Sequence, residues 1–112
     1  MAQTGRKIFV EHTPDVTTIN LLDTQVLEQK EIQDLESAIM EVVQQSKRQL
    51  LVLDFGNIRF LSSSMLGLLV KVQKRLAEEK RSLELHNIKP DIMKVFKITK
   101  LDKLFVIKNK GG

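Results

Sequence analysis

The 112-residue chain contains no cysteine, tryptophan or tyrosine, and it has few prolines and glycines. Without cysteine there is no disulfide bond and no thiolate metal ligand, and nothing points to an oxidising compartment. The two histidines, His12 and His86, are too far apart in the sequence to indicate a metal site. Five scattered glycines form neither a Walker loop nor a dinucleotide-binding loop. We therefore expect no metal and no cofactor.

Long apolar runs are also missing. No segment approaches the roughly 18 consecutive apolar residues that a membrane-spanning helix needs. The first twelve residues lack the apolar stretch and the cleavage site of a signal peptide. We therefore expect a cytoplasmic protein that does not enter a membrane. The length and the hydrophobic content of 42% suit one domain over residues 1–112, with a core at about 8–108 and flexible ends.

Charge is distributed unevenly along the chain. Residues 1–70 carry 6 Lys or Arg and 9 Asp or Glu, whereas residues 71–112 carry 12 and 5. The basic C-terminal part suits an acidic partner, a phosphate or nucleic acid. We expect no direct nucleic-acid binding, because the aromatic residues are five phenylalanines in apolar runs, which are typical of a core and not of exposed stacking surfaces.

Apolar runs that alternate with helical periodicity predict an α/β fold. Two stretches rich in β-branched residues flank a Thr-Pro-Asp turn, which indicates a hairpin at or near a sheet edge. The order β-β-α-β-α-β-α-β predicts a mixed, mostly parallel sheet of about five strands with helices packed on it. The expected strands are 8–12, 16–22, 50–55, 82–88 and 104–107, and the expected helices are about 27–46, a stretch with Met65, Leu69, Val72 and Leu76 on one face, and 90–96.

Three consecutive serines, residues 62–64, stand between the apolar strand at 50–55 and the second long helix. Serine is a preferred N-cap, so the run is typical of a turn that opens a helix. As a nucleophile elbow it lacks the flanking glycines of G-x-S-x-G, and its base would have to be His12 or His86, whose geometry the sequence does not fix. Catalysis is poorly supported, and we expect no enzyme.

Phosphorylation is a second chemistry open to the same serines. A phosphoryl group of charge about −1.5 to −2 is tolerated at a helix N-terminus, where free backbone N–H groups and the positive end of the dipole face it. The fold would survive, but a partner packed over the helix start would have to desolvate and face the charge. An ordinary helix cap without a regulatory role is the simpler explanation.

The sequence LLVLDFGNIRFLSSSMLG at residues 50–67 resembles the central signature of STAS domains, the family of bacterial anti-sigma factor antagonists. In that signature an LVLDL-type strand and a D-S-S/T-G-L-G turn precede the second helix. The sequence KITKLDKLFVI at 97–107 is similar to the family's ending L-x-x-T-G-L-D-x-L-F-x-I. The resemblance extends over about residues 8–108 and implies a STAS-like fold.

The resemblance also implies a function. In the family, a serine or threonine of the turn is phosphorylated by a partner serine kinase that is also an anti-sigma factor. That position falls on Ser64, with Ser63 and Ser62 as alternatives. The implied protein binds the anti-sigma factor, frees a sigma factor for transcription and is switched off by phosphorylation. A phosphatase is a further candidate partner, and we expect a monomer or a weak dimer.

The chain departs from the family pattern at several positions. Ser62 stands in place of Asp, Met65 in place of the first Gly, and Lys100 in place of the Gly of T-G-L-D. Loss of the acid removes a charge that a kinase site can use, and we expect Met65 to place a bulky group beside the phosphoacceptor. A left-handed conformation at Lys100 would cost about 1 kcal/mol relative to glycine. The usual G-x-x-D turn near the N-terminus has only Asp23 as a counterpart.

Gly67 lies inside the second long predicted helix, where glycine costs about 1 kcal/mol relative to alanine. Close packing against the sheet is one explanation. Close approach of a partner is the other, and it predicts a docking face in which the three serines, Leu66 and Val70 surround the glycine. The basic residues further along the helix fit its solvated side or an acidic rim on the partner.

Two other functions stay open. The domain could be an unphosphorylated STAS scaffold or a subunit of a signalling or transport complex, which the altered positions Ser62 and Met65 favour. The third hypothesis is small-ligand binding, for example of a nucleotide, near the serine turn.

Overall fold

The computed structural model describes residues 8–22 and 29–108, which form a five-stranded sheet in the order β1-β2-β3-β4-β5 together with three α-helices. The mixed α/β architecture confirms the predicted fold class. The elements are β1 (Ile8–His12), β2 (Val16–Leu21), α1 (Gln29–Gln45), β3 (Leu50–Asp54), α2 (Ser63–Glu78), β4 (Ser82–His86), α3 (Pro90–Ile98), the 3₁₀ turn η2 (Leu101–Lys103) and β5 (Val106–Lys108).

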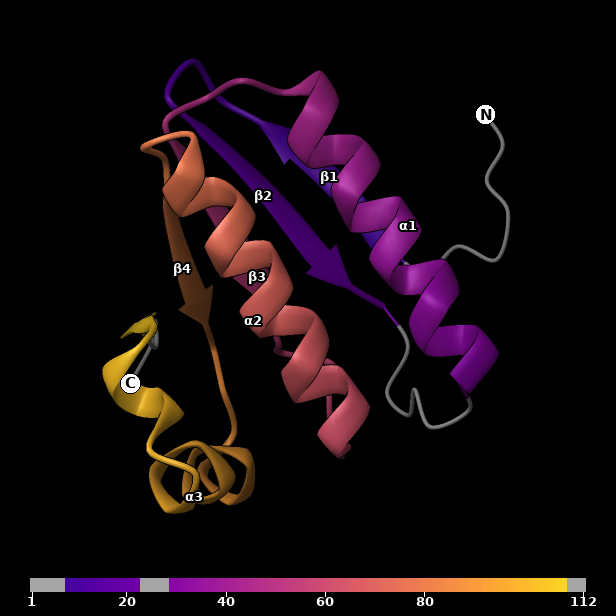
Figure 1. The fold of residues 1–112 in the computed structure, drawn as a ribbon, viewed down its shortest axis with the longest axis vertical. Helices are drawn as coiled ribbons and strands as arrows, with labels where there is room; N and C mark the ends of the chain where they lie inside the picture. Colours follow the sequence, from indigo (N-terminus) through magenta and orange to yellow (C-terminus); the bar gives the residue numbers. More distant parts are fainter. Residues whose placement is uncertain (1–7, 23–28, 109–112) are drawn as a thin grey trace.

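The sheet is parallel except at one edge. β1 and β2 form an antiparallel hairpin, whereas β2, β3, β4 and β5 run parallel to one another. α1 and α2 pack side by side across one face of the sheet, and α3 lies beyond the carboxyl end of β4 (Figure 1). None of the helices in the described part of the chain is long and apolar enough to cross a bilayer.

The core lies between the sheet and the two long helices. Alternate residues of β2, namely Thr17, Ile19 and Leu21, are buried toward the helices, as the period of a strand requires. The predicted apolar face of α2 is confirmed, because Met65, Leu69, Val72 and Leu76 are all buried. Near the C-terminus, the rings of Phe96 and Phe105 meet edge to face with their centroids 6.0 Å apart.

The last strand differs from its prediction. Residues 104–107 were expected to be a strand because they form a short apolar run, but β5 begins only at Val106. The backbone N–H groups of Leu104 and Phe105 both donate to the carbonyl of Leu101, so these two residues close the η2 turn and do not pair with β4. Phe105 is nevertheless buried, whereas Leu104 is exposed.

Smaller differences concern the ends of other elements. The predicted helix at 27–46 corresponds to α1, and its first two residues lie outside the described ones. The strand predicted at 82–88 stops at His86, since Asn87 has a φ of 61° that a strand cannot continue. α3 continues to Ile98, two residues beyond the predicted end.

Arg81 connects the end of α1 with the start of β4. Its guanidinium donates to the carbonyl oxygens of Val43, Ser46 and Arg48, and only 6% of its side chain is exposed. The last carbonyl groups of a helix have no partner within the helix, and a cation there also interacts favourably with the dipole. Arg81 therefore satisfies backbone groups that would otherwise be left without partners at the end of α1.

Lys100 follows α3 and has φ 64° and ψ 16°, the left-handed conformation expected where the family pattern has glycine. A side chain in this conformation places Cβ close to a backbone carbonyl oxygen, which glycine avoids. Lys100 therefore ends the helix in a conformation that costs free energy for lysine but not for glycine.

We predict that Lys100→Gly raises the free energy of unfolding by about 1 kcal/mol and the thermal midpoint by about 4 °C. Thermal unfolding followed by circular dichroism measures this. The matched control is Lys94→Gly, which removes the same charge from the interior of α3 and should lower the free energy of unfolding by about 1 kcal/mol. A loss of stability in Lys100→Gly would contradict the assigned backbone strain.

Candidate functional site at the start of helix α2

Ser62 caps α2. Its backbone is extended, with φ −90° and ψ 165°, and its Oγ accepts a hydrogen bond from the backbone N–H of Met65 at 3.1 Å. Its carbonyl oxygen accepts the N–H of Leu66, which begins the helical ladder. The predicted N-cap within the serine run is thereby confirmed and assigned to its first member. Ser63 and Ser64 form the start of the first turn, and both are exposed.

Met65 does not crowd Ser64, so our expectation of a bulky neighbour at the phosphoacceptor was wrong. The side chain of Met65 is 2% exposed and belongs to the hydrophobic core. Successive residues of a helix point about 100° apart, so the burial of Met65 directs Ser64 away from it. The methionine that replaces the glycine of the family pattern therefore packs in the hydrophobic core.

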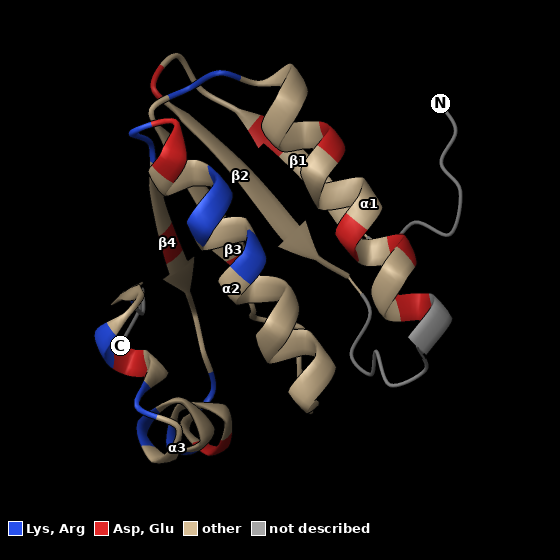
Figure 2. Ribbon diagram, in the orientation of Figure 1, with Lys and Arg blue, Asp and Glu red and all other residues tan. Residues whose placement is uncertain are grey.

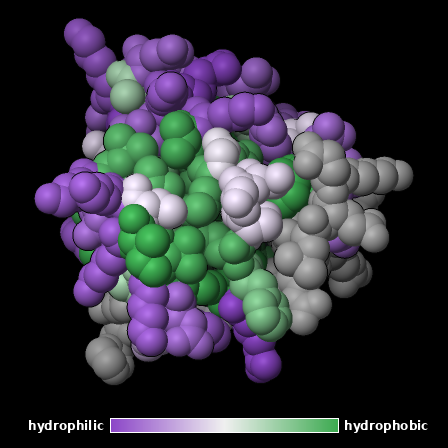
Figure 3. All heavy atoms as spheres, turned by 60° about the horizontal axis from the view of Figure 1, so that its bottom comes forward, coloured by the Kyte–Doolittle hydropathy of each residue, from purple (hydrophilic) through white to green (hydrophobic). Residues whose placement is uncertain are grey.

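Gly67 lies exposed on α2, and a Cβ built on it would have no atom within 4 Å. Close packing against the sheet, one of the two explanations for this glycine, is therefore wrong. Leu66 and Val70 are only partly buried against the core, and Phe60, just before the serine turn, is 53% exposed. Viewed from the end of the molecule where α2 begins, apolar atoms form a broad patch (Figure 3).

The loop that leads to the serine turn is tied to the end of β4. One carboxylate oxygen of Asp54 accepts the backbone N–H of Gly56 at 2.8 Å, and the other accepts the side-chain amide of Asn87 at 2.9 Å. The ammonium of Lys89 donates to the carbonyl oxygen of Gly56. These bonds fix the first residues after β3. No local pattern in the sequence indicates these bonds, because Asn87 and Lys89 lie 33 residues away from their partners.

Charge is absent from the start of α2 and present further along it. The first turn holds no acidic residue, and the lower end of α2 is tan in Figure 2, the colour of residues other than Lys, Arg, Asp and Glu. Lys71 lies 3.5 Å from Glu36 of α1, and Arg75 lies 3.0 Å from Glu79. The positive end of the helix dipole at the serines is therefore not compensated by a carboxylate of its own first turn.

The histidines are engaged elsewhere. His86 Nε2 lies 2.9 Å from Glu84 Oε1, and the His86 side chain is 12% exposed. This hydrogen bond lowers the pKa of Glu84; burial opposes the shift, and Lys108 adds to it. His12 Nδ1 lies 3.1 Å from Thr17 Oγ1. No hydrogen bond described in the structure joins a serine of the run to either histidine.

Neither a metal site nor the family's N-terminal G-x-x-D turn can be described at this site. Within the described residues, no three side chains of His, Asp or Glu come together in a way that could hold a metal ion. Asp23, the candidate for the family's N-terminal turn, lies outside the described residues. The site thus combines exposed serine hydroxyls, a bare glycine and partly exposed apolar side chains around a helix N-terminus whose first turn has no acidic residue.

Several solved structures resemble this fold. An anti-sigma-factor antagonist (STAS) domain protein from Planctomyces limnophilus is 24% identical, with a TM-score of 0.81 over 92% of this chain and 90% of that one. An anti-sigma factor antagonist from Mycobacterium paratuberculosis is 26% identical, with a TM-score of 0.76 over 90% and 83%. The Bacillus cell fate determinant SpoIIAA in its phosphorylated form is 21% identical, with a TM-score of 0.66 over 89% of each chain.

The family can be assigned from the sequence itself. No curated protein shows significant similarity to the chain. The sequence profile of the STAS domain, however, matches residues 10–111. This match confirms the resemblance seen in the serine turn and in the C-terminal motif, and it covers nearly the whole chain. The chain therefore belongs to the STAS domain family.

Proposed function

We propose that this protein is an anti-sigma factor antagonist that docks through the start of α2 and is switched off by phosphorylation of Ser64. The observation that carries the proposal is the exposure of Ser64 in the first turn of α2, which has no acidic residue and has partly exposed apolar side chains around it. Similar structures include an anti-sigma factor antagonist, SpoIIAA, known in an unphosphorylated and a phosphorylated form.

The three serines differ in what phosphorylation would cost. The Oγ of Ser62 caps the helix, and losing an N-cap costs about 1 kcal/mol. The hydroxyls of Ser63 and Ser64 make no hydrogen bond described in the structure, so a kinase can take either without breaking one. The family pattern selects Ser64 between these two. Ser64 also lies one turn before Gly67, on the same side of the helix.

Gly67 supports contact with another protein. A glycine inside a helix lowers stability by about 1 kcal/mol relative to alanine. The space around Gly67 is open, so its own fold gives no reason to exclude a side chain there. A partner whose backbone or side chain approaches α2 closely at this point supplies that reason. Leu66 and Val70 would then give the contact its apolar component.

Phosphorylation would change binding more than folding. The phosphate would meet free backbone N–H groups at the helix start, in a first turn without acidic residues. A docked partner would have to desolvate the same charge against an apolar surface. A hundredfold weakening of the complex requires about 2.7 kcal/mol, which one charge forced into such a contact can supply.

The proposed regulatory scheme combines this surface with what the family resemblance implies. The unmodified protein captures an anti-sigma factor that is also a serine kinase, and the captured factor releases its sigma factor for transcription. The kinase ends the interaction by phosphorylating Ser64, and a phosphatase restores it. We place these events in the cytoplasm and expect the free protein to be a monomer or a weak dimer that contacts no nucleic acid directly.

A non-phosphorylated STAS module in a larger signalling or transport complex is the second candidate. The observation that favours it is the position of Ser62, which has no acid where the family pattern has Asp and which serves as a helix cap. Mass spectrometry of the protein from its native host separates the two functions, because only the first predicts phosphate on residues 62–64.

The first prediction from this proposed function concerns the phosphoacceptor. With Mg-ATP and the anti-sigma factor kinase of the same organism, the protein should accept one phosphate, and Ser64→Ala should abolish it. Intact-mass spectrometry and peptide mapping measure this. Ser63→Ala is the matched control and should be phosphorylated like the unaltered protein. Equal phosphorylation of Ser64→Ala would defeat the site assignment.

The second prediction separates binding from folding. Ser64→Asp should weaken binding to the same anti-sigma factor by about one to two orders of magnitude, since a carboxylate carries less charge than a phosphate. Its thermal midpoint should stay within about 4 °C of the original, because the helix N-terminus tolerates an acid. Calorimetric titration and thermal unfolding measure the two quantities. Undiminished affinity would mean that the partner docks elsewhere.

The third prediction concerns Gly67. Gly67→Leu should weaken binding at least about tenfold by steric exclusion while leaving stability unchanged or improved, since the new side chain enters open space. Ala77→Leu is the control, because it adds the same side chain to an exposed position near the other end of α2. If both variants bind like the unaltered protein, α2 does not face the partner at Gly67.

A further inference from the structure

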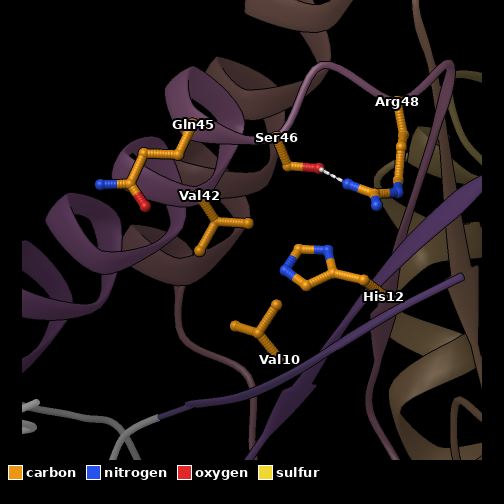
Figure 4. A pocket seen from close by; sticks show the side chains of 6 residues that line it. All are labelled: Val10, His12, Val42, Gln45, Ser46 and Arg48. Carbon is orange, nitrogen blue, oxygen red and sulfur yellow. Dashed lines mark hydrogen bonds between the residues drawn. The ribbon is translucent and has the colours of Figure 1, made fainter.

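A pocket of about 340 Å³ lies between β1 and the C-terminal end of α1 (Figure 4). It is at the opposite end of the sheet from the start of α2, because α1 ends beside the β1–β2 turn, whereas α2 begins at the other end of the strands (Figure 1). Binding pockets for small molecules begin at about this size. Its lining residues are Val10, His12, Val42, Gln45, Ser46 and Arg48.

A row of hydrogen bonds runs along the polar side of the pocket. Arg48 Nη1 donates to Ser46 Oγ at 3.3 Å, Ser46 Oγ lies 2.5 Å from Thr17 Oγ1, and Thr17 Oγ1 lies 3.1 Å from His12 Nδ1. Thr17 and Ser46 are the two buried polar residues of the described chain. Since buried hydroxyl groups need partners, the row supports the pocket wall as a unit.

The row also favours one position for the proton of a neutral His12 ring. Arginine can only donate, so Ser46 accepts from Arg48. If Ser46 then donates to Thr17 and Thr17 donates to His12 Nδ1, every hydroxyl hydrogen has an acceptor. In the opposite direction the hydrogen of Ser46 has none within the row. The first arrangement leaves the proton on His12 Nε2, on the side of the ring that faces Val42 across the pocket (Figure 4).

The guanidinium of Arg48 has N–H groups that are not used in the hydrogen bonds described in the structure. Its Nε donates to the carbonyl oxygen of Thr13 and its Nη1 to Ser46, which orient the group beside the His12 ring. Its Nη2 makes no hydrogen bond described in the structure. Arg48 and His12 Nε2 thus present donors and positive charge to the same side of the pocket. A planar anionic group with two acceptor oxygens, such as a carboxylate, suits such a pair of donors.

The other walls of the pocket indicate which groups the rest of a ligand would carry. Val10 and Val42 supply apolar surface between the two polar sides. On the far side, the amide nitrogen of Gln45 donates to Glu41 at 3.4 Å, which turns the amide oxygen toward the pocket (Figure 4). That oxygen accepts a hydrogen bond, so the far end of a ligand would carry an O–H or N–H donor.

The end of α1 does not repel an anion here through unpaired carbonyl groups. The carbonyl oxygen of Val42 accepts the N–H of Ser46 at 2.8 Å, and the carbonyl oxygens of Val43 and Ser46 accept from Arg81. The negative end of the helix dipole is therefore covered by Arg81.

We propose that this pocket binds a small organic carboxylate with a short apolar body and a hydroxyl or amine at its other end. The carboxylate lies against Arg48 and His12 Nε2, the body lies between Val10 and Val42, and the far donor meets Gln45. This site does not include the serine run, so it does not depend on the proposed docking function.

Three probes of one shape test the proposal in the intact protein. 4-Hydroxybenzoate has both polar ends, benzoate lacks the hydroxyl, and 4-hydroxybenzamide lacks the charge. In ¹⁵N NMR titrations, 4-hydroxybenzoate should cause saturable shifts at residues 12, 46 and 48, and the neutral amide should bind at least about tenfold more weakly. Benzoate should bind about threefold more weakly, because the Gln45 oxygen loses its partner. Absence of saturation by about 20 mM 4-hydroxybenzoate, or equal affinity for the amide, would overturn the proposal.

Two variants test the polar sides separately. Gln45→Glu places a carboxylate on the far side of the pocket and should weaken 4-hydroxybenzoate binding at least about fivefold by repulsion. Gln44→Glu is its matched control, because this neighbouring exposed residue gains the same charge but does not line the pocket. Arg48→Gln should remove saturable binding. Because Gln45 is exposed, its variant keeps the fold even if Arg48→Gln does not, and an unchanged affinity in Gln45→Glu would contradict the proposed pose.

Discussion

The packing of α2 against the sheet determines which of its residues the protein presents to others. Met65 and Leu69 are almost completely buried, one turn apart on the same side of the helix. Because each residue advances the helix by about 100°, Ser64 and Gly67 must face outward. A rotation that buried Gly67 would expose Met65, and exposing one large apolar side chain costs about 1.5–3 kcal/mol. The hydrophobic core therefore fixes the exposure of the serines.

Polar contacts complete this arrangement at the helix start. Ser62 caps the N-terminus of α2. Asp54 connects the preceding loop to the end of β4 through hydrogen bonds with Gly56 and Asn87. The surface around the serines is thus held in place from both sides by contacts within the protein. A surface that needs little ordering on binding loses less entropy, so a small uncharged patch can still form a useful contact.

Patterns of apolar residues were enough to predict the order of strands and helices along the chain, the two long helices and the buried face of α2. They failed where neighbouring residues in space are distant in sequence. The apolar residues Leu104 and Phe105 were assigned to a strand, but their backbone groups bond to Leu101. Likewise, Arg81 finds its three carbonyl partners 33 to 38 residues earlier in the chain. No local pattern encodes such contacts.

The candidate sites show the same limit. The serine run was visible because its motif is contiguous, and the cap could be predicted from residue type alone. The pocket was not visible, since His12 and Arg48 belong to different elements and are joined through Thr17 and Ser46. Even within the motif, the sequence suggested that Met65 would crowd Ser64. The direction of a side chain depends on which face of the helix is buried, and only the assembled core decides that.

The replacement of Asp by Ser62 can be understood from the same geometry. Aspartate and serine both cap helices by accepting a backbone N–H, so Ser62 preserves the turn. An aspartate would also place a negative charge at the helix end where a phosphate on Ser64 would lie, and the two charges would repel. With serine at this position, the phosphate meets the backbone N–H groups and the helix dipole without an acidic neighbour in the first turn. The substitution therefore preserves the helix cap and removes a charge that would repel a phosphate at the proposed position.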